Sequence, residues 1–259
     1  MSSISCFHPL ALPEELSPLL SRGFSPALAA YRLGGPAGLL RSAPPVHLRG
    51  GLLVIEQAAP LPEIDLRSLC RQIMQECRLR GASGVLCRWK NRSSLLWDLS
   101  RLLGQTLAQG GFRLWLEEEY AGAWEESAVL VNSRTQSSRL ETGLLRSLER
   151  WGRDRTALDL RPYARDHLLP SPDGHGRDLS ASALEDLIRR ARGRVYWSEE
   201  QCARYFTLQE GESLHYVVFD DRASLIRKME RAKALGIQMA VVPWQEMAGL
   251  EDQWRRLVG

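Results

Sequence analysis

The sequence lacks the cysteine pattern of a disulfide framework or a metal site. It has five cysteines, an odd number, and no Cys-x-x-Cys pair: Cys6, Cys70, Cys77, Cys87 and Cys202. Two of them lie seven residues apart on a predicted helix and a third lies in a predicted strand, where cysteine behaves as a small buried hydrophobe. We therefore expect free thiols in a reducing compartment.

Long apolar runs and basic blocks are missing as well. No stretch approaches the ~18 consecutive apolar residues of a transmembrane helix. Pro9, Pro13 and Glu14 interrupt any apolar core of a signal peptide near the N-terminus. The formal charge of +3 is spread along the chain, without the basic clusters that bind nucleic acids. We expect a cytoplasmic protein that binds neither membranes nor nucleic acids.

Several catalytic motifs are also absent. The histidines at positions 8, 47, 167, 175 and 215 are scattered, without a His-Glu-x-x-His or comparable metal spacing. There is no Gly-x-Ser-x-Gly nucleophile motif, and Gly34-Gly35 lacks the remainder of a phosphate-binding loop. We therefore expect no metal and no cofactor.

What the sequence does contain is a regular alternation of short apolar runs with amphipathic stretches of helical spacing. Such runs are typical of parallel strands buried on both faces, connected by helices. The length of 259 residues suits a (β/α) barrel, which takes ~250. We predict an α/β fold, a TIM-type (β/α)8 barrel, in which six runs are parallel neighbours in one closed sheet: 52–55, 85–87, 112–116, 128–131, 157–160 and 239–242.

Two parts of the chain depart from this rhythm. Residues 1–50 must supply the first two barrel strands, which we expect to be short or irregular; a helix at 14–21 and a strand at 28–33 are the visible signals there. Residues 163–221 combine a helix after Ser180 with β-type runs at 194–197 and 203–208. We interpret this segment as a small α+β insertion before the last barrel strand, within a single domain of residues 1–259.

The segment from His215 to Trp244 reads as a strand, a helix and a second strand. The first run ends at Asp220 and Asp221, as a strand does when it meets a helix N-cap, and the helix ends at Gly236. The order H-Y-V-V-F-D-D-R-A-S-L, then K-M-E-R-A-K-A-L-G-I, then a strand ending in Trp resembles the C-terminal end of family 18 glycoside hydrolases. It is most similar to the chitinase-like enzymes among bacterial spore and cell-wall hydrolases. The resemblance implies that Trp244 forms the floor of a sugar pocket.

The resemblance also implies a catalytic motif, D-x-x-D-x-D-x-E, at the end of the fourth barrel strand. In that family the Glu protonates the glycosidic oxygen. The Asp two residues earlier stabilises the intermediate made by the substrate's own acetamido oxygen, a case outside the usual two-carboxylate scheme. Aligned by Gly84, this sequence has Ser83, Leu86 and Arg88 in place of the aspartates and Lys90 in place of the Glu.

These replacements reverse the charge that the chemistry requires. A general acid must release its proton near the working pH, whereas an ordinary Lys has a pKa of ~10.4. Arg88 would repel the positive charge of the transition state. The sixth strand departs too, because Ser133 and Arg134 stand where the family has a Tyr-Asp pair. We predict a degenerate catalytic motif.

Three functional hypotheses follow. The preferred one is a catalytically inactive relative of the family that binds a carbohydrate or a protein partner at the former active-site mouth. The second is an active glycosidase for an N-acetylglucosamine-containing glycan, with a displaced acid/base among Glu118, Glu56 and Glu246. The third is a structural interaction protein without a ligand, because a fold alone does not decide function.

For the preferred hypothesis, the predicted ligand-binding residues are Arg88, Lys90, Trp244 and Asn132. Strand residues two apart point to the same side, so Arg88 and Lys90 should both face the mouth. A planar guanidinium beside a compact ammonium suits an anionic sugar or a phosphate. The alternative is that these cations pair with Glu56 and Glu118 and merely neutralise the pocket.

Overall fold

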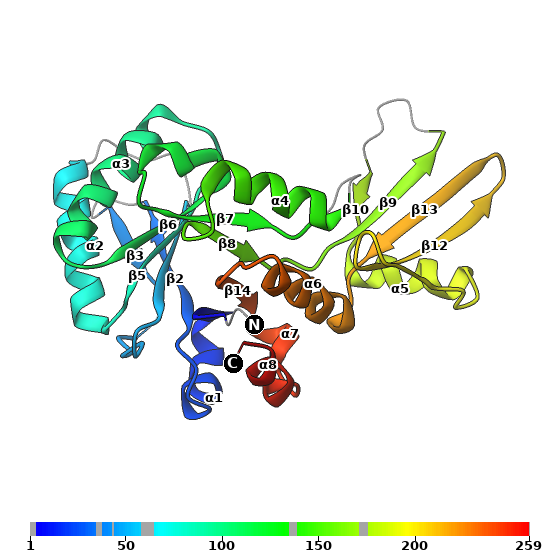
Figure 1. The fold of residues 1–259 in the computed structure, drawn as a ribbon, viewed down its shortest axis with the longest axis horizontal. Helices are drawn as coiled ribbons and strands as arrows, with labels where there is room; N and C mark the ends of the chain where they lie inside the picture. Colours follow the sequence, from blue (N-terminus) through cyan, green and yellow to red (C-terminus); the bar gives the residue numbers. More distant parts are fainter. Residues whose placement is uncertain are drawn as a thin grey trace.

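The computed structural model describes residues 4–34, 38–42, 44–57, 65–134, 139–170 and 176–258. Figure 1 shows a barrel surrounded by helices and, on one side of it, a projecting arm. We use "arm" for residues 163–221. Both termini lie close together on the barrel.

The barrel is one sheet of eight parallel strands. In spatial order, starting from the first strand of the chain, these are β1 (Cys6–Ala11), β14 (Met239–Pro243), β8 (Thr156–Asp159), β7 (Ala128–Asn132), β6 (Arg113–Glu117), β5 (Gly84–Arg88), β4 (Leu52–Gln57) and β2 (Ala27–Leu33). The pairing of β1 with β2 closes the sheet. The six runs predicted as parallel neighbours are confirmed, since each pairs in parallel with the next.

The first two strands are longer than expected. β1 has six residues and β2 has seven, so neither is abridged. The predicted irregularity is present in β2, whose register with β4 shifts between Ala29 and Tyr31. A short strand, β3 (Leu39–Arg41), pairs antiparallel with β2 outside the barrel.

Helices cover the outside of the barrel. The residues around α2 show why these segments are helical: Asp65 accepts a hydrogen bond from the backbone N–H of Arg67, and Gly81 ends the helix at φ 57°. None of the described helices is long and apolar enough to cross a membrane. The helical elements of the barrel are η1 (Pro13–Glu15), α1 (Leu16–Ser21), α2 (Leu66–Arg80), α3 (Ser94–Gln109), η2 (Glu118–Ala123), α4 (Leu140–Trp151), α6 (Arg222–Ala234), α7 (Trp244–Met247) and α8 (Glu251–Val258).

Alternate strand residues face the lumen and the helical layer. On β5, Val85 and Cys87 belong to the large outer core that packs against the helices, whereas Leu86 faces inward. Below the carboxyl ends of the strands, apolar side chains fill the lumen. This part of the lumen is therefore a packed core and not a channel. This inner cluster consists of Ala27, Leu52, Val54, Leu86, Trp115, Ala128, Leu130, Ala157, Met239 and Val241.

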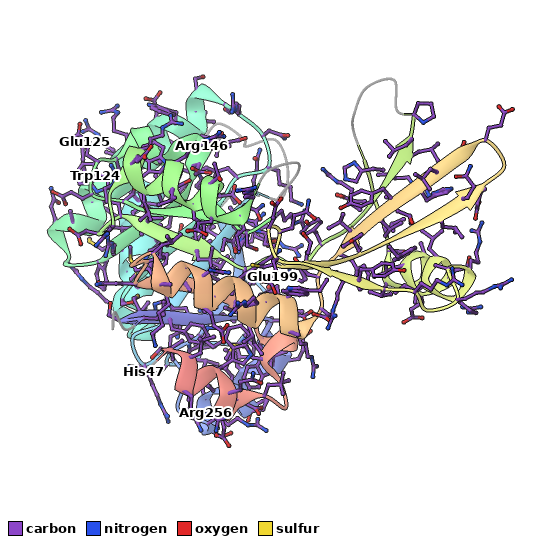
Figure 2. The ribbon with its side chains drawn as sticks, turned by 45° about the vertical axis from the view of Figure 1, so that its right-hand side comes forward. His47, Trp124, Glu125, Arg146, Glu199 and Arg256 are labelled. Carbon is purple, nitrogen blue, oxygen red and sulfur yellow. The ribbon has the colours of Figure 1, made fainter. Side chains whose placement is uncertain are left out.

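The arm lies between β8 and β14, where the insertion was predicted. It is an antiparallel sheet with one helix, α5 (Ala181–Arg190), packed on it. Its base contacts the barrel: Glu199 lies at the junction (Figure 2), and the carbonyl of Glu200 accepts a hydrogen bond of 2.9 Å from the N–H of Leu140 in α4. The strands, in spatial order, are β10 (Arg177–Asp178), β9 (Ala164–Leu169), β13 (Ser213–Phe219), β12 (Ala203–Glu210) and β11 (Tyr196–Ser198).

The two aspartates that carry the sequence resemblance are structural. Asp221 caps α6 by accepting from the N–H of Ser224 at 2.7 Å. Asp220 accepts from Lys228 Nζ at 2.7 Å, and both side chains are fully buried. Lys228 also lies 4.8 Å from the ring centre of Tyr163 at the start of the arm. This buried ion pair therefore connects the end of the arm to a barrel helix.

We predict that Lys228→Met destabilises the protein by about 3–5 kcal/mol, because it leaves the Asp220 carboxylate buried without its partner. The double variant Asp220→Leu/Lys228→Met should recover most of this loss, since a buried pair can be replaced by apolar residues of similar volume. Denaturant unfolding measures both. Equal losses in the single and double variants would contradict the pairing.

The same pair predicts a pH dependence. Burial raises the pKa of Asp220 from 3.8 to about 6, although Lys228 opposes this shift. Between these two values the folded chain holds a proton that the unfolded chain has released, so protonation favours the folded state. The wild type should therefore gain stability relative to Asp220→Leu/Lys228→Met as the pH falls from about 6 to about 4. Parallel pH curves for the two proteins would contradict the raised pKa.

Candidate functional site

The carboxyl ends of five neighbouring barrel strands, β4, β5, β6, β7 and β8, line a cavity of about 630 Å³. We call it the mouth cavity. Because catalytic and binding residues of (β/α) barrels lie at this end, it is the natural candidate site. Its lining residues are Glu56, Arg88, Trp89, Lys90, Glu117, Glu118, Glu119, Leu130, Asn132, Asp159 and Arg161.

The fourth barrel strand, β5, contributes cations to this cavity. Arg88 and Lys90 both line it, in agreement with the register predicted from Gly84. Arg88 donates from Nη1 and Nη2 to the two carboxylate oxygens of Asp159, at 3.2 and 3.1 Å. Asp159 lies on β8, so this bidentate ion pair joins the fourth and seventh barrel strands across the mouth.

The partner of Arg88 is therefore neither Glu56 nor Glu118, which were the partners considered from the sequence. Lys90 is exposed and makes no hydrogen bond or ion pair with the residues that the structure describes. The two cations thus differ in kind. Arg88 is held in a fixed position by Asp159, whereas Lys90 is free to meet a ligand.

Arg161 extends the charged network. Its Nε donates to Asp159 and its Nη2 donates to Glu117, each at 2.5 Å. Burial alone would lower the pKa of Arg161, but these two carboxylates raise it. Asp159, with only 3% of its side chain exposed, thus lies between two guanidinium groups. The order Arg88, Asp159, Arg161 and Glu117 alternates in sign across the mouth.

Carboxylates outnumber cations around the mouth. Glu56 makes no hydrogen bond or ion pair with any described residue and stands at the end of β4. Glu118 accepts through Oε1 from Ser147 Oγ and Trp151 Nε1 of α4, at 3.1 and 3.2 Å. The lining has five carboxylates (Glu56, Glu117, Glu118, Glu119 and Asp159) against three cations (Arg88, Lys90 and Arg161).

Two of the predicted site residues lie elsewhere. Trp244 is 5% exposed, and the centre of its ring lies 6.1 Å from that of Phe24. The guanidinium of Arg22 lies over the Trp244 ring, 5.6 Å from its centre. Met239 and Val241 of β14 face the lumen, whereas Trp244, the first residue of helix α7, belongs to the outer core that packs against the helical layer. It does not line the mouth cavity, and neither does Glu246 in the same short helix. This corrects the expectation that Trp244 floors a sugar pocket.

The sixth barrel strand, β7, ends at polar residues that make local hydrogen bonds. Asn132 lines the mouth, as predicted, and its Oδ1 accepts from the N–H of Arg134 at 2.9 Å. Ser133 is fully buried, and its Oγ accepts from the N–H of Arg161 at 3.3 Å. Ser133 and Arg134 therefore shape the backbone beside the mouth and do not line it.

Sequence reasoning missed Asp159 and Arg161. Asp159 interrupts an otherwise apolar strand, and a charged residue on a buried strand is itself a signal of a specific partner. Arg161 follows two residues later, on the same side. The pairing with Arg88 was not visible, because it requires the fourth and seventh strands to face each other across a closed barrel.

The described residues hold no group of three or more His, Cys, Asp or Glu side chains placed to bind a metal ion. His8, the histidine inside the barrel, donates to or accepts from local groups: its Nδ1 lies 2.9 Å from the carbonyl of Ser25, and its Nε2 lies 3.2 Å from Cys6 Sγ. Burial lowers the pKa of His8, so it is a neutral packing residue near the amino end of the barrel.

We predict that Asp159→Asn destabilises the protein by about 3–5 kcal/mol, because it removes the charge that pairs with two partly buried arginines. Lys90→Ala is the matched control at the same mouth, and its effect should stay within about 0.5 kcal/mol, since the side chain is exposed and unpaired. Urea unfolding compares the two. A loss in Asp159→Asn no larger than that in the control would contradict the network.

No protein-family model and no curated protein sequence matches the chain. Solved structures do. The spore cortex-lytic enzyme SleL of Bacillus cereus has a TM-score of 0.67 at 15% identity, over 100% of this chain and 74% of that one. A class V chitinase from Nicotiana tobaccum has a TM-score of 0.65 at 12% identity, over 100% and 99%.

A third similar structure is a chitinase-like agglutinin from Robinia pseudoacacia, with a TM-score of 0.58 at 14% identity, covering 97% of this chain and 99% of that one. Lytic enzymes, chitinases and an agglutinin thus share this architecture. The identities are too low to carry activity from any of them. They confirm the fold predicted from the resemblance: the chain has the chitinase-like barrel of the family 18 glycoside hydrolases, with an antiparallel insertion before its last strand.

Proposed function

We propose that this protein binds a carbohydrate in the mouth cavity and does not hydrolyse it. The single observation that carries the proposal is the end of β5, where the inward positions are Leu86, Arg88 and Lys90. In the resembled family these positions hold the acid and the supporting aspartates. Here none of them bears a carboxyl group.

The ion pair between Arg88 and Asp159 strengthens the case against hydrolysis. It places a fixed guanidinium in the mouth, where hydrolysis by the family's route would develop positive charge on the sugar. Asp159 in turn is shared between two arginines, so its charge is already compensated. At the end of β5 a guanidinium therefore stands where the family's route would need a carboxylate, while the polar lining of the cavity still suits a ligand with many hydroxyl groups.

A carbohydrate is the ligand class supported by the structural neighbours, among which are chitinases and an agglutinin. The cavity volume of about 630 Å³ lies in the range of small-ligand sites, and a recessed mouth of this kind suits a sugar better than a flat protein surface. Lys90 and Asn132 line the cavity and offer a hydrogen-bond donor and an amide to such a ligand.

The charge balance favours an uncharged sugar over the anionic one considered from the sequence. Arg88 is already paired with Asp159, and the other carboxylates of the lining would repel the anionic group of an acidic sugar. Lys90 is the observation that keeps an acidic sugar as a second candidate, because it is unpaired among the described residues. In that case Lys90→Ala should weaken the binding of the acidic sugar more than the binding of the neutral one.

The alternative of an active glycosidase narrows to one arrangement. Glu246 lies outside the mouth and Glu118 is held by α4, which leaves Glu56 as the predicted carboxylate without a partner. Glu117, although paired with Arg161, lines the same cavity. We take Glu56 and Glu117 as the acid/base pair that this alternative would use.

We predict no release of reducing sugar from N-acetylglucosamine hexasaccharide or from peptidoglycan strands, and intact recovery of the hexasaccharide after incubation, because no acid stands at the end of β5. Mass spectrometry of the recovered sugar detects cleavage. Turnover that is abolished by Glu56→Gln or Glu117→Gln, and not by Lys90→Ala, would establish the displaced-acid alternative instead.

Titration calorimetry tests the binding half of the proposal. The neutral hexasaccharide should bind the wild type, and Lys90→Ala together with Asn132→Ala should weaken binding about tenfold, the equivalent of 1.4 kcal/mol. If the wild type binds neither neutral nor acidic oligosaccharides, the proposed sugar binding in the mouth is wrong. A purely structural role would then be favoured.

A further inference from the structure

A second cavity adjoins the mouth. It has a volume of about 680 Å³ and is bounded by the start of α3, the turn η2 and the helix α4. We call it the rim cavity. Glu118 and Glu119 line both cavities and thus form a wall that the two cavities share.

The main apolar surface of the rim cavity is the indole of Trp97. Its side chain is 40% exposed, whereas most other tryptophans of the chain are buried or half-buried. The ring lies 6.3 Å from that of Tyr120 at an angle of 39°. A Cβ atom on Gly122 would lie only 3.1 Å from Cη2 of Trp97, so the absence of a side chain there lets the indole rest against η2.

The support beneath Trp97 is rigid. Tyr120 is buried, and its hydroxyl donates to the carbonyl of Asn91 at 2.5 Å while accepting from the N–H of Ser93 at 3.1 Å. These bonds fix the turn that precedes α3. The indole is therefore packed on one side, and its exposed surface lines the cavity.

Polar groups surround this indole in balanced charge. Arg92 pairs with Glu119 at 3.5 Å. Arg150 lies over the ring of Trp151 at 4.5 Å, and Trp151 in turn donates to Glu118. Two guanidinium groups and two carboxylates thus line the same cavity as this indole, so their charges balance and do not select an ion.

We infer that the rim cavity is a second sugar-binding subsite, with Trp97 as its stacking platform, and that a glycan longer than a disaccharide extends from the mouth over the Glu118 wall onto it. An aromatic face suits the apolar face of a sugar ring, and the neighbouring guanidinium and carboxylate groups suit its hydroxyls. This inference rests on the proposed function, because the same glycan must occupy the mouth.

The test compares N-acetylglucosamine disaccharide with the hexasaccharide by titration calorimetry on the 259-residue chain. In the wild type the hexasaccharide should bind about tenfold more tightly than the disaccharide, since only the longer ligand covers the indole. Trp97→Ala should remove most of that advantage and leave the affinity for the disaccharide unchanged. Trp97→Phe should retain part of it, because the smaller ring still offers a face.

Leu95→Ala is the matched control, since Leu95 lies on the same helix, is 37% exposed and lines neither cavity. Its hexasaccharide affinity should equal that of the wild type. Arg150→Ala serves as a second variant on a different helix, and should weaken the hexasaccharide alone.

The outcomes separate the inference from the proposed function. Equal wild-type affinity for the two sugars, or a hexasaccharide advantage that survives both Trp97→Ala and Arg150→Ala, overturns the rim subsite while the mouth still binds sugar. A wild type that binds neither sugar overturns both.

Discussion

The alternation of side chains along the strands of a closed barrel is the constraint on which the site depends. Each strand can send only every second residue into the lumen, and the last inward residue of each strand reaches the mouth. Leu86 is inward and apolar, so Arg88 is inward and reaches the mouth. By the same rule Asp159 follows Ala157 into the lumen, and barrel closure brings these two residues together. Replacing the charged residue at either position would therefore change the charge at the centre of the site.

The residues that carry the resemblance to the chitinase-like family maintain the fold, whereas the proposed loss of hydrolysis concerns the end of β5. Asp220 and Asp221 join the arm to α6 through a buried ion pair and a helix cap. Both interactions stabilise the fold whether or not the barrel hydrolyses a substrate. A carboxyl group at the end of β5 is required only for hydrolysis. These fold-maintaining interactions, together with an end of β5 that bears no carboxyl group, are the combination that the proposed binding function requires.

Most of the barrel could be predicted, because buried parallel strands are read from local sequence. The first strand, Cys6–Ala11, was only inferred to exist, since His8 and Pro9 break its apolar run. The inward direction of Arg88 followed from strand parity. Its partner Asp159 is 71 residues away along the chain, and only the closed sheet brings it near.

Trp244 shows the opposite error. Its role was carried over from the resemblance, whereas in the structure Trp244 begins helix α7 and packs in the outer core. The second cavity could not be predicted either, because it forms between the start of α3, η2 and α4. The sequence did not indicate a binding role for Trp97. An exposed tryptophan on a helix can occupy the same position in the apolar spacing as a buried one.

A crystal structure of the protein soaked with N-acetylglucosamine hexasaccharide tests the central claim most directly. We expect an intact, uncleaved sugar in the mouth, with the two hydrogen bonds between Arg88 and Asp159 unbroken beneath it. A cleaved sugar, or Arg88 displaced from Asp159 with a glutamate in contact with the glycosidic oxygen, would contradict the claim that this barrel binds without hydrolysing.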